Sequence, residues 1–208
     1  VRVAKMNVNL VAIDEAHCIS QWGYDFRPSY LNIAKLREFL AVPAPFLALT
    51  ATATPAVIDD IQEKLQFRQK NVLWKSFERK NLIYLVRNVE NKNGYLVKTL
   101  KKVKGSGIIY TRSRKRTWEL AELLQKQGIS ADFYHAGLDS EVRNKKQDAW
   151  QNDRVRIITA TNAFGMGIDK PDVRFVIHYD LPDSLEAYYQ EAGRAGRDGE
   201  RSFAVLLY

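Results

Sequence analysis

The stretch LVAIDEAHCIS, residues 10–20, joins a short apolar run to two adjacent acids. Four apolar residues in succession, 10–13, are typical of a parallel β-strand that is covered on both faces. Asp14 and Glu15 follow at once, and His17 comes two residues later. A carboxylate at a strand end can hold Mg²⁺, and a second one can accept a proton from water. The alternative is an acidic turn that only caps the next helix, and these letters alone do not decide between the two.

Seven further runs rich in β-branched residues predict strands, in addition to residues 10–14. They cover residues 46–50, 82–86, 107–111, 131–135, 155–161, 174–179 and 202–208. Helix signals lie between them. Thr54 and Pro55 form an N-cap and first helical position, a helix over 117–127 ends at Gly128, and Asp183 with Glu186 has the form of a capping box. The alternation predicts an α/β fold, a parallel sheet flanked by helices.

Polar residues dominate the stretch 67–81, which we take as a boundary between two lobes. The expected domains are therefore residues 1–75 and 76–208. In folds of this class ligands bind at the carboxyl ends of the strands. Most of the predicted strands end in polar, small or charged residues, so both lobes carry candidate sites.

Composition narrows the range of partners. The 208 residues carry a formal net charge of +8, which favours nucleic acid as a partner, although general solubility is the alternative. Cys18 is the only cysteine, so the chain holds no internal disulfide and no multi-cysteine zinc site. The apolar runs are too short for a membrane span and no signal peptide is seen. We expect an intracellular, cytoplasmic protein.

Two loops of the first lobe contain candidate functional residues. In ALTATATP, residues 48–55, the helix cap explains Thr54 but leaves Thr50 and Thr52 unexplained. In SQWGYDFRPSY, residues 20–30, aromatic side chains surround Gly, Asp, Arg and Pro. Aromatic residues usually belong to a core, but in a loop beside arginine they suit stacking on nucleic-acid bases.

Basic residues in TRSRKR, residues 111–116, lie at the start of a predicted helix. The helix dipole favours anions at that end, so the pattern indicates a bound phosphate, with a solvated charge run as the alternative. The loop TNAFGMGIDKPD, residues 161–172, follows a strand. Its Gly165 and Gly167 would let backbone N–H groups approach a ligand closely, although one Gly-x-Gly is weak evidence.

The segment YYQEAGRAGRDG, residues 188–199, places Gln190, Arg194 and Arg197 at positions i, i+4 and i+7. That spacing predicts one face of a helix. Glycine costs about 1 kcal/mol in a helix interior, so its repeated use indicates that another surface comes very close. Two neighbouring arginines suit the binding of a triphosphate. The alternative is an ordinary surface helix whose arginines form salt bridges.

In this order, the motifs resemble the motor core of the RecQ family of DNA helicases, within the DEAD/DEAH-box superfamily. DEAH resembles motif II, SQWGYDFRP the RecQ aromatic-rich loop, ALTATA motif III, GIIYTRSR motif IV, ATNAFGMGIDKPDVR motif V and YYQEAGRAGRDG motif VI. The likeness covers almost the whole chain. It implies RecA-like folds: a partial first lobe and a nearly complete second lobe.

The resemblance implies roles in ATP hydrolysis. Asp14 would hold Mg²⁺ and Glu15 would activate water. His17, Thr50 and Thr52 would couple hydrolysis to movement. The other nucleotide contacts that it implies are Gly167 and Asp169, the latter near the ribose, and Gln190, Arg194 and Arg197, which would close over the phosphates.

The resemblance also implies DNA as the partner, both single strands and duplex junctions. Its DNA contacts would be Trp22, Phe26, Arg27, Arg112, Arg114, His135 and Asn162. The family usually has histidine where this chain has Tyr24, which cannot titrate near neutral pH. The implied protein is an ATP-dependent 3′-to-5′ DNA helicase of DNA repair and recombination, nucleoid-associated if bacterial.

No G-x-x-x-x-G-K-[ST] phosphate loop occurs in these residues. We therefore expect a fragment that lacks the N-terminal half of the first lobe and the family's four-cysteine zinc subdomain. By itself the fragment would be inactive. Two alternatives stay open: a nucleic-acid-binding RecA-like module without catalysis, and a DEAD/DEAH-type RNA helicase.

Overall fold

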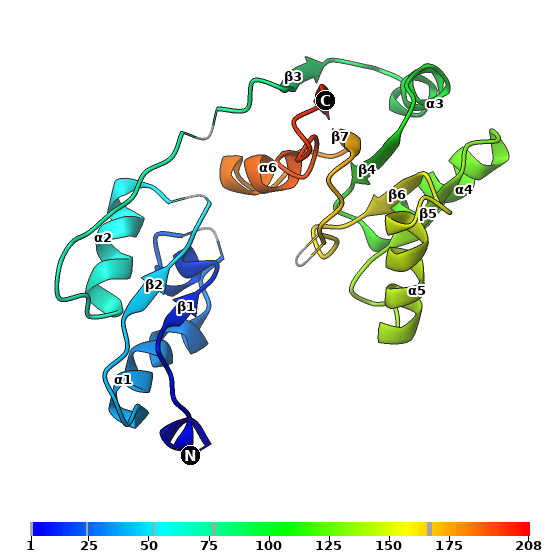
Figure 1. Ribbon diagram of the computed structural model, residues 1–208. Helices are drawn as coiled ribbons and strands as arrows, with labels where there is room; N and C mark the ends of the chain where they lie inside the picture. The colour runs from blue at the N-terminus through cyan, green and yellow to red at the C-terminus, as the bar shows by residue number, and fades with distance from the viewer. Residues whose placement is uncertain (1, 24, 52, 77, 166–167) are drawn as a thin grey trace. The chain divides into compact units, whose positions relative to one another are not determined.

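The computed structural model describes residues 2–23, 25–51, 53–76, 78–165 and 168–208. The chain divides into two compact units, Val1–Ser76 and Phe77–Tyr208 (Figure 1). We describe each unit by itself. Among the described residues, every helix is too short or too polar to span a bilayer.

Unit 1 is built on two short parallel strands, β1 (Val11–Ile13) and β2 (Phe46–Ala48), with Val11 opposite Phe46. Helix α2 (Pro55–Lys64) begins as predicted, because the Thr54 side chain accepts a hydrogen bond from the Val57 N–H. The remaining elements are η1 (Arg2–Lys5), η2 (Ala16–Ile19), η3 (Pro28–Lys35) and α1 (Leu36–Phe39). Their small core comprises Ile13, Ala16, Ile19, Val57, Ile61 and Leu65.

Unit 2 contains a six-stranded sheet in the order β3-β8-β7-β4-β6-β5, and all of its neighbouring strands are parallel. The strands are β3 (Leu82–Arg87), β4 (Ser106–Tyr110), β5 (Ala131–Tyr134), β6 (Ile157–Ala160), β7 (Val173–His178) and β8 (Ser202–Leu207). The helices are α3 (Lys92–Lys102), α4 (Arg114–Lys126), α5 (Ser140–Gln151) and α6 (Leu185–Ala192). The α/β fold expected from the sequence is confirmed.

Successive residues of the central strands bury opposite faces of this sheet. Ile108 and Val176 pack in one cluster with Trp150 of α5 and Ala192 of α6. Their neighbours in the sequence pack in a second cluster with leucines of α3 and α4, comprising Ile109, Ile177, Leu96, Leu100, Leu120 and Leu124. Helices on both faces explain why these strands are apolar at consecutive positions.

Three helix ends differ from the sequence-based expectation. Helix α4 begins at Arg114 rather than 117, because Ser113 accepts a hydrogen bond from the Arg116 N–H and acts as its cap. Helix α6 is capped by Ser184 rather than Asp183, through a bond from the Ala187 N–H. The helix ends at Ala192, so the residues after it follow turns and not a helix.

We expect unit 1 to exchange its backbone amides faster than unit 2. Its two strands have three residues each, and Leu47 and Leu49 are 42% and 46% exposed, whereas the central strands of unit 2 are paired on both sides. Hydrogen exchange of the 208-residue chain, measured by mass spectrometry, would compare residues 11–13 and 46–48 with residues 106–110 and 157–160. Equal protection of the two sets would contradict this expectation.

Candidate active site

The two acids lie where β1 ends. Glu15 adopts a left-handed conformation, with φ of 49°, and its N–H donates to Asp14 Oδ1 at 2.8 Å. Asp14 is exposed and Glu15 is half-buried. Carboxylate oxygens are the donors that a hard divalent cation prefers, so this pair fits Mg²⁺.

His17 links the acids to the end of the neighbouring strand. Its buried Nδ1 lies 3.3 Å from Glu15 Oε2 and 3.1 Å from Thr50 Oγ1, just beyond β2. Burial lowers the pKa of His17, which favours the neutral imidazole. The structure thus brings together Glu15, His17 and Thr50, three of the predicted site residues, whereas Thr52 lies outside the described residues.

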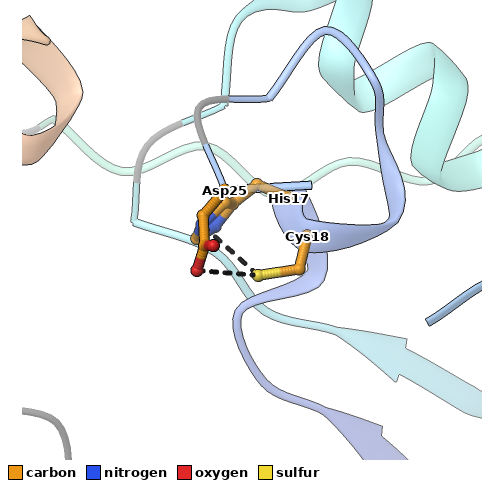
Figure 2. A group of neighbouring side chains, drawn as sticks. All are labelled: His17, Cys18 and Asp25. Atoms are coloured by element: carbon orange, nitrogen blue, oxygen red, sulfur yellow. Dashed lines mark hydrogen bonds between the residues drawn. The ribbon is translucent and has the colours of Figure 1, made fainter. Parts of the chain in front are cut away.

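On its other side, His17 connects to the aromatic loop, residues 20–30 (Figure 2). Its Nε2 lies 3.8 Å from Cys18 Sγ, which donates to Asp25 Oδ2 at 3.7 Å. Asp25 in turn accepts a hydrogen bond from Arg27 Nη2 at 2.5 Å. Burial raises the pKa of the Cys18 thiol to about 11, so the sulfur keeps its proton. A continuous series of contacts therefore runs from Glu15 to Arg27.

His17, Cys18 and Asp25 also offer one nitrogen, one sulfur and one oxygen within 4.8 Å of one another. That donor set has the composition of a transition-metal site. However, the Arg27 guanidinium already neutralises the Asp25 carboxylate and would repel a cation. We therefore assign no metal to this cluster.

Among the described residues of the aromatic loop, one large side chain lies in solvent. Trp22 is 79% exposed, whereas Phe26 and Arg27 are half-buried. A side chain at Gly23 would come within 2.6 Å of the His17 carbonyl oxygen, so the loop needs glycine to pass so close to η2. Tyr24 lies outside the described residues. The position of Trp22 fits the predicted stacking surface rather than a core.

In unit 2, Arg194 and Arg197 do not share a helical face with Gln190, contrary to the expectation from their spacing. Gln190 lies in α6, and both arginines lie in the turns over residues 193–199. Gly196 has φ of +61°, which favours glycine and is incompatible with a continuing helix. We name residues 193–199 the arginine turn.

Arg194 is held against the loop that follows β6. Its Nη1 donates to the Gly165 carbonyl oxygen at 2.5 Å. Gly165 has φ of +132°, and a side chain there would come within 2.1 Å of Arg194 Cζ. This glycine therefore permits a close approach of Arg194. Gly167 lies outside the described residues.

Arg197 is more accessible. Its Nη1 donates to the Ile168 carbonyl oxygen at 3.1 Å and to Asp169 Oδ1 at 3.2 Å. The Arg197 side chain is 38% exposed and that of Asp169 is 86% exposed. An ion pair this exposed is worth little, so the guanidinium can turn to another anion at small cost.

The basic start of α4 already has partners. Glu119, on the same helix, lies 3.6 Å from both Lys115 and Arg116, and Arg112 pairs with Asp183. These acids supply part of the negative charge that the sequence assigned to a bound phosphate. Arg114 is exposed and forms no ion pair with an acid among the described residues.

Arg114 and His135 meet over Gly137. A side chain at Gly137 would lie 3.0 Å from Arg114 Nη1 and 3.3 Å from His135 Nδ1. Burial, followed by the charge of Arg114, lowers the pKa of His135. Its Nδ1 is buried without a hydrogen-bond partner among the described residues.

A cavity of about 210 Å³ opens at the carboxyl ends of β4, β6 and β7. Its lining includes the predicted Arg112 and Asn162, and also Asp180, which the sequence analysis missed. Asp180 accepts hydrogen bonds from the Thr111 hydroxyl at 2.6 Å and from the Arg112 N–H at 3.0 Å.

The floor of this cavity holds a buried pair that the sequence analysis also missed. His178 Nε2 lies 2.9 Å from Glu191 Oε2. The two residues are 13 positions apart, on β7 and α6, and no local pattern joins them. Only the position of His178 at a strand end was a usable signal.

Residues 91–199, slightly more than half of the chain, match the model of the helicase conserved C-terminal domain. The chain belongs to this helicase family. The match includes β4 to β7, the cavity and the arginine turn.

Several relatives of this helicase chain carry RecQ names, and one, from Acanthamoeba polyphaga mimivirus and 46% identical over 204 residues, is named a putative ATP-dependent RNA helicase. The chain is 48% identical over 204 residues to the ATP-dependent DNA helicase RecQ of Bacillus subtilis, which covers 98% of this chain and 34% of that protein. It is 51% identical over 202 residues to the RecQ-like DNA helicase BLM of Xenopus laevis, covering 94% of this chain and 15% of that protein. The resemblance to the RecQ family is confirmed. The chain spans about one third of the length of the Bacillus protein and a smaller share of the Xenopus protein.

Solved helicase structures share the fold. The helicase Lhr of Mycobacterium smegmatis, bound to single-stranded DNA and AMP-PNP, superposes with a TM-score of 0.78 and 24% sequence identity, over 96% of this chain and 28% of that one. At this identity the likeness concerns the fold alone. It agrees with the RecA-like architecture implied by the sequence.

Proposed function

We propose that this chain is part of the motor of an ATP-dependent DNA helicase of RecQ type. The observation that carries the proposal is the meeting of Glu15, His17 and Thr50 beyond the ends of β1 and β2. A water-activating acid held by a neutral histidine suits hydrolysis, and the threonine extends the contact to a second strand. The names of the Bacillus and Xenopus relatives support DNA as the polymer acted on.

In the proposed reaction, Asp14 would hold Mg²⁺, which when bound would neutralise phosphate charge. Glu15 would accept a proton from the attacking water at a carboxylate oxygen. His17 orients that carboxylate through its Nδ1 contact. Burial lowers the pKa of His17, which favours the neutral imidazole beside that carboxylate.

Arg197 and Arg194 of the arginine turn would have different roles. Arg197, held only by Ile168 and the exposed Asp169, would stabilise charge on the transferred phosphoryl group. Arg194, fixed on the Gly165 carbonyl, would support the turn. Asp169 and Gly167 remain proposed nucleotide contacts, as does Gln190.

The DNA contacts would come from both units, each considered by itself. In unit 1 they are Trp22, Phe26 and Arg27. In unit 2 they are Arg112, Arg114, His135 and Asn162. The unpartnered His135 Nδ1 beside Arg114, and the cavity lined by Arg112 and Asn162, suit phosphate oxygens of a strand. DNA junctions as substrates, and repair and recombination as processes, follow from the same proposal.

The test uses Trp22→Ala in the complete helicase, by which we mean a protein that contains this chain together with a phosphate-binding loop. We expect basal ATPase activity to persist and its stimulation by single-stranded DNA to fall about 5–150-fold, because one stacked base is worth about 1–3 kcal/mol. The reason is that Trp22 is exposed on a loop joined to Glu15 through Cys18 and His17. Steady-state ATPase rates with and without DNA measure both quantities.

Trp74→Ala is the matched control, since Trp74 is also an exposed tryptophan of unit 1 but lies far along the sequence from the loop. Single-stranded RNA is assayed beside DNA. Equal loss of basal and stimulated rates in Trp22→Ala would make Trp22 a structural residue. Stronger stimulation of the unsubstituted protein by RNA would replace the DNA assignment with an RNA helicase.

A further inference from the structure

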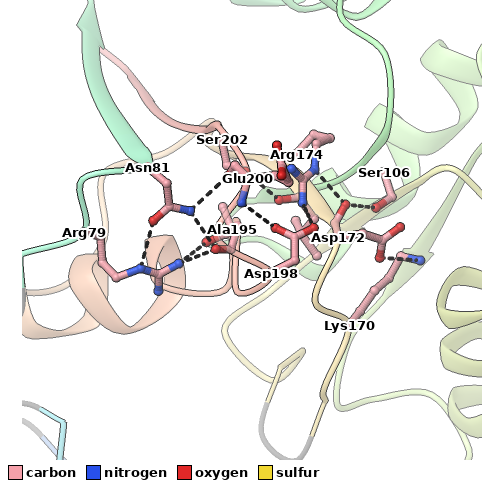
Figure 3. A network of polar contacts seen from close by, with 12 residues as sticks. Arg79, Asn81, Ser106, Lys170, Asp172, Arg174, Ala195, Asp198, Glu200 and Ser202 are labelled. Atoms are coloured by element: carbon pink, nitrogen blue, oxygen red, sulfur yellow. Dashed lines mark hydrogen bonds and ion pairs between the residues drawn. The ribbon is translucent and has the colours of Figure 1, made fainter.

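The segment just before β3 is hydrogen-bonded to the arginine turn and the residue that follows it (Figure 3). Arg79 Nη2 donates to the carbonyl oxygens of Ala195 at 3.1 Å and Gly196 at 2.5 Å. Asn81 Nδ2 donates to the same Gly196 oxygen at 2.7 Å and to the Glu200 oxygen at 2.9 Å. More than a hundred positions of sequence separate the donors from the acceptors.

Because the helix has ended, donors from outside the turn add to the one bond that the Gly196 oxygen receives within it, from the Gly199 N–H at 3.1 Å. After Ala192 the backbone follows turns, so the oxygens of Ala195 and Gly196 have no continuing α-helix to satisfy them. The Arg79 guanidinium supplies charged donors, which form stronger hydrogen bonds than neutral ones. Its Nε also donates to Asn81 Oδ1 at 3.3 Å, which fixes the orientation of the Asn81 amide.

The approach of Asn81 is close enough to exclude any side chain at Gly196. A Cβ there would lie 2.6 Å from Asn81 Nδ2 and 2.7 Å from Ser202 Oγ. Other groups of the turn contact β7 and the segment before it, where the Asp198 N–H donates to the Pro171 oxygen at 3.2 Å. The Gly196 N–H donates to the Val173 oxygen at 2.8 Å, and Arg174 pairs with Asp198, which lowers the pKa of that carboxyl.

Gly196 lies between the two arginines of the turn, two residues after Arg194 and one before Arg197. A displacement of its carbonyl therefore moves both guanidinium groups. The bonds of Arg194 to Gly165 and of Arg197 to Ile168 restrain the side chains but not the Gly196 peptide itself. Within the turn, the Gly199 N–H donates to that peptide's oxygen at 3.1 Å; from outside the turn, Arg79 and Asn81 donate to it.

We propose that Arg79 and Asn81 are positioning residues that set the arginine turn for ATP hydrolysis. This inference rests on the proposed function. Both residues act through the Gly196 carbonyl and contact no substrate. They stand three and five positions after Ser76, the last residue of unit 1, so they join the start of unit 2 to the turn that carries its two arginines.

The test measures kcat and KM for ATP in the complete helicase with Arg79→Ala and Asn81→Asp. Asn81→Asp keeps the side-chain shape but replaces both donors with an acceptor that faces carbonyl oxygens. We expect kcat to fall about 10–100-fold, as for residues that orient a catalytic group, with KM changed little. Arg79→Lys should recover part of the loss, since an ammonium can reach a carbonyl but cannot also fix Asn81.

Arg87→Ala is the matched control, because Arg87 is an exposed arginine of β3 whose guanidinium bonds only the adjacent Val86 carbonyl among the contacts described. A second measurement uses the 208-residue chain and no nucleotide. Hydrogen exchange over residues 195–200 should accelerate in Arg79→Ala and Asn81→Asp, and residues 106–110 should be unaffected. Arg87→Ala should change neither.

Unchanged kcat in Arg79→Ala and Asn81→Asp would overturn the inference, and so would a loss in kcat that Arg79→Lys does not reduce at all. Unchanged exchange of residues 195–200 would overturn it as well. The proposed function fails separately, when the unsubstituted complete helicase shows no DNA-stimulated ATP hydrolysis.

Discussion

Replacing Arg197 with alanine is expected to lower ATP turnover by the complete helicase about 10³–10⁵-fold, with little change in ATP affinity. A guanidinium of this kind acts on charge that develops in the transition state, so its loss appears in kcat rather than in binding. The structure supports this choice of arginine. Arg197 is 38% exposed and its ionic partner is the exposed Asp169, so it is able to turn toward a phosphate.

Arg197→Lys should not restore turnover, because a point charge lacks the planar fork that spans two phosphate oxygens. Arg194→Ala is the informative comparison. Its guanidinium lies against Gly165, so we expect a smaller loss of kcat than for Arg197→Ala. Nucleotide binding and single-turnover hydrolysis are measured separately. The assignment is wrong if Arg197→Ala chiefly weakens ATP binding, or if Arg194→Ala is the more damaging to turnover.

Glu15→Gln is expected to lower hydrolysis by about 10²–10⁴-fold while leaving nucleotide binding nearly intact. The amide keeps the shape of the side chain but has no basic oxygen to accept a proton from water. His17 and Thr50 remain on their own elements, η2 and the residues after β2, so the surrounding structure should persist. Binding of a fluorescent nucleotide and release of phosphate provide the two readouts.

Glu63→Gln provides the control, since Glu63 is an exposed acid of α2 in the same unit. If Glu15→Gln hydrolyses ATP at the rate of the control, another group accepts the proton. In that case Glu15 would be reduced to a capping acid of the turn, the alternative that the DEAH letters left open.

All eight strands were predictable from the sequence, because each is a short, mainly apolar run and most of them end at polar, small or charged residues. The helix starts were less certain. Ser113 and Ser184 cap α4 and α6, yet neighbouring residues, Thr117 and Asp183, offered competing signals. Capping depends on which side chain accepts a backbone N–H, and several polar residues in a row leave that choice to the geometry of the turn.

The end of α6 was the largest error in the fold. The spacing of Gln190, Arg194 and Arg197 matched a helix, and the glycines were taken as places of close packing. Close packing does occur at Gly196, against Asn81 and Ser202. Yet the positive φ of Gly196 also ends helical geometry, and a glycine every third residue was the signal for consecutive turns.

Among the site residues, those that follow strands were predictable, since parallel strands bring their carboxyl ends to one edge. The sequence could not show that His17 joins Glu15 to Thr50, because 33 positions separate His17 from that threonine. Arg79, Asn81 and Glu191 carried no local signal, and for His178 the one signal was its position at a strand end. Their partners are set by tertiary contacts between segments that are remote in the sequence.

The place of β3 at the edge of the sheet determines when this part of the protein can be completed during synthesis. β3 is the first strand of unit 2, yet its partner in the sheet is β8, the last. A nascent chain emerging from the ribosome therefore carries β3 unpaired until the final strand has been made, and such long-range pairing is slow to form. The hydrogen bonds of Arg79 and Asn81 to Gly196 likewise cannot form until Gly196 has been synthesised. The arginine turn is thus among the last features of unit 2 to take shape during translation.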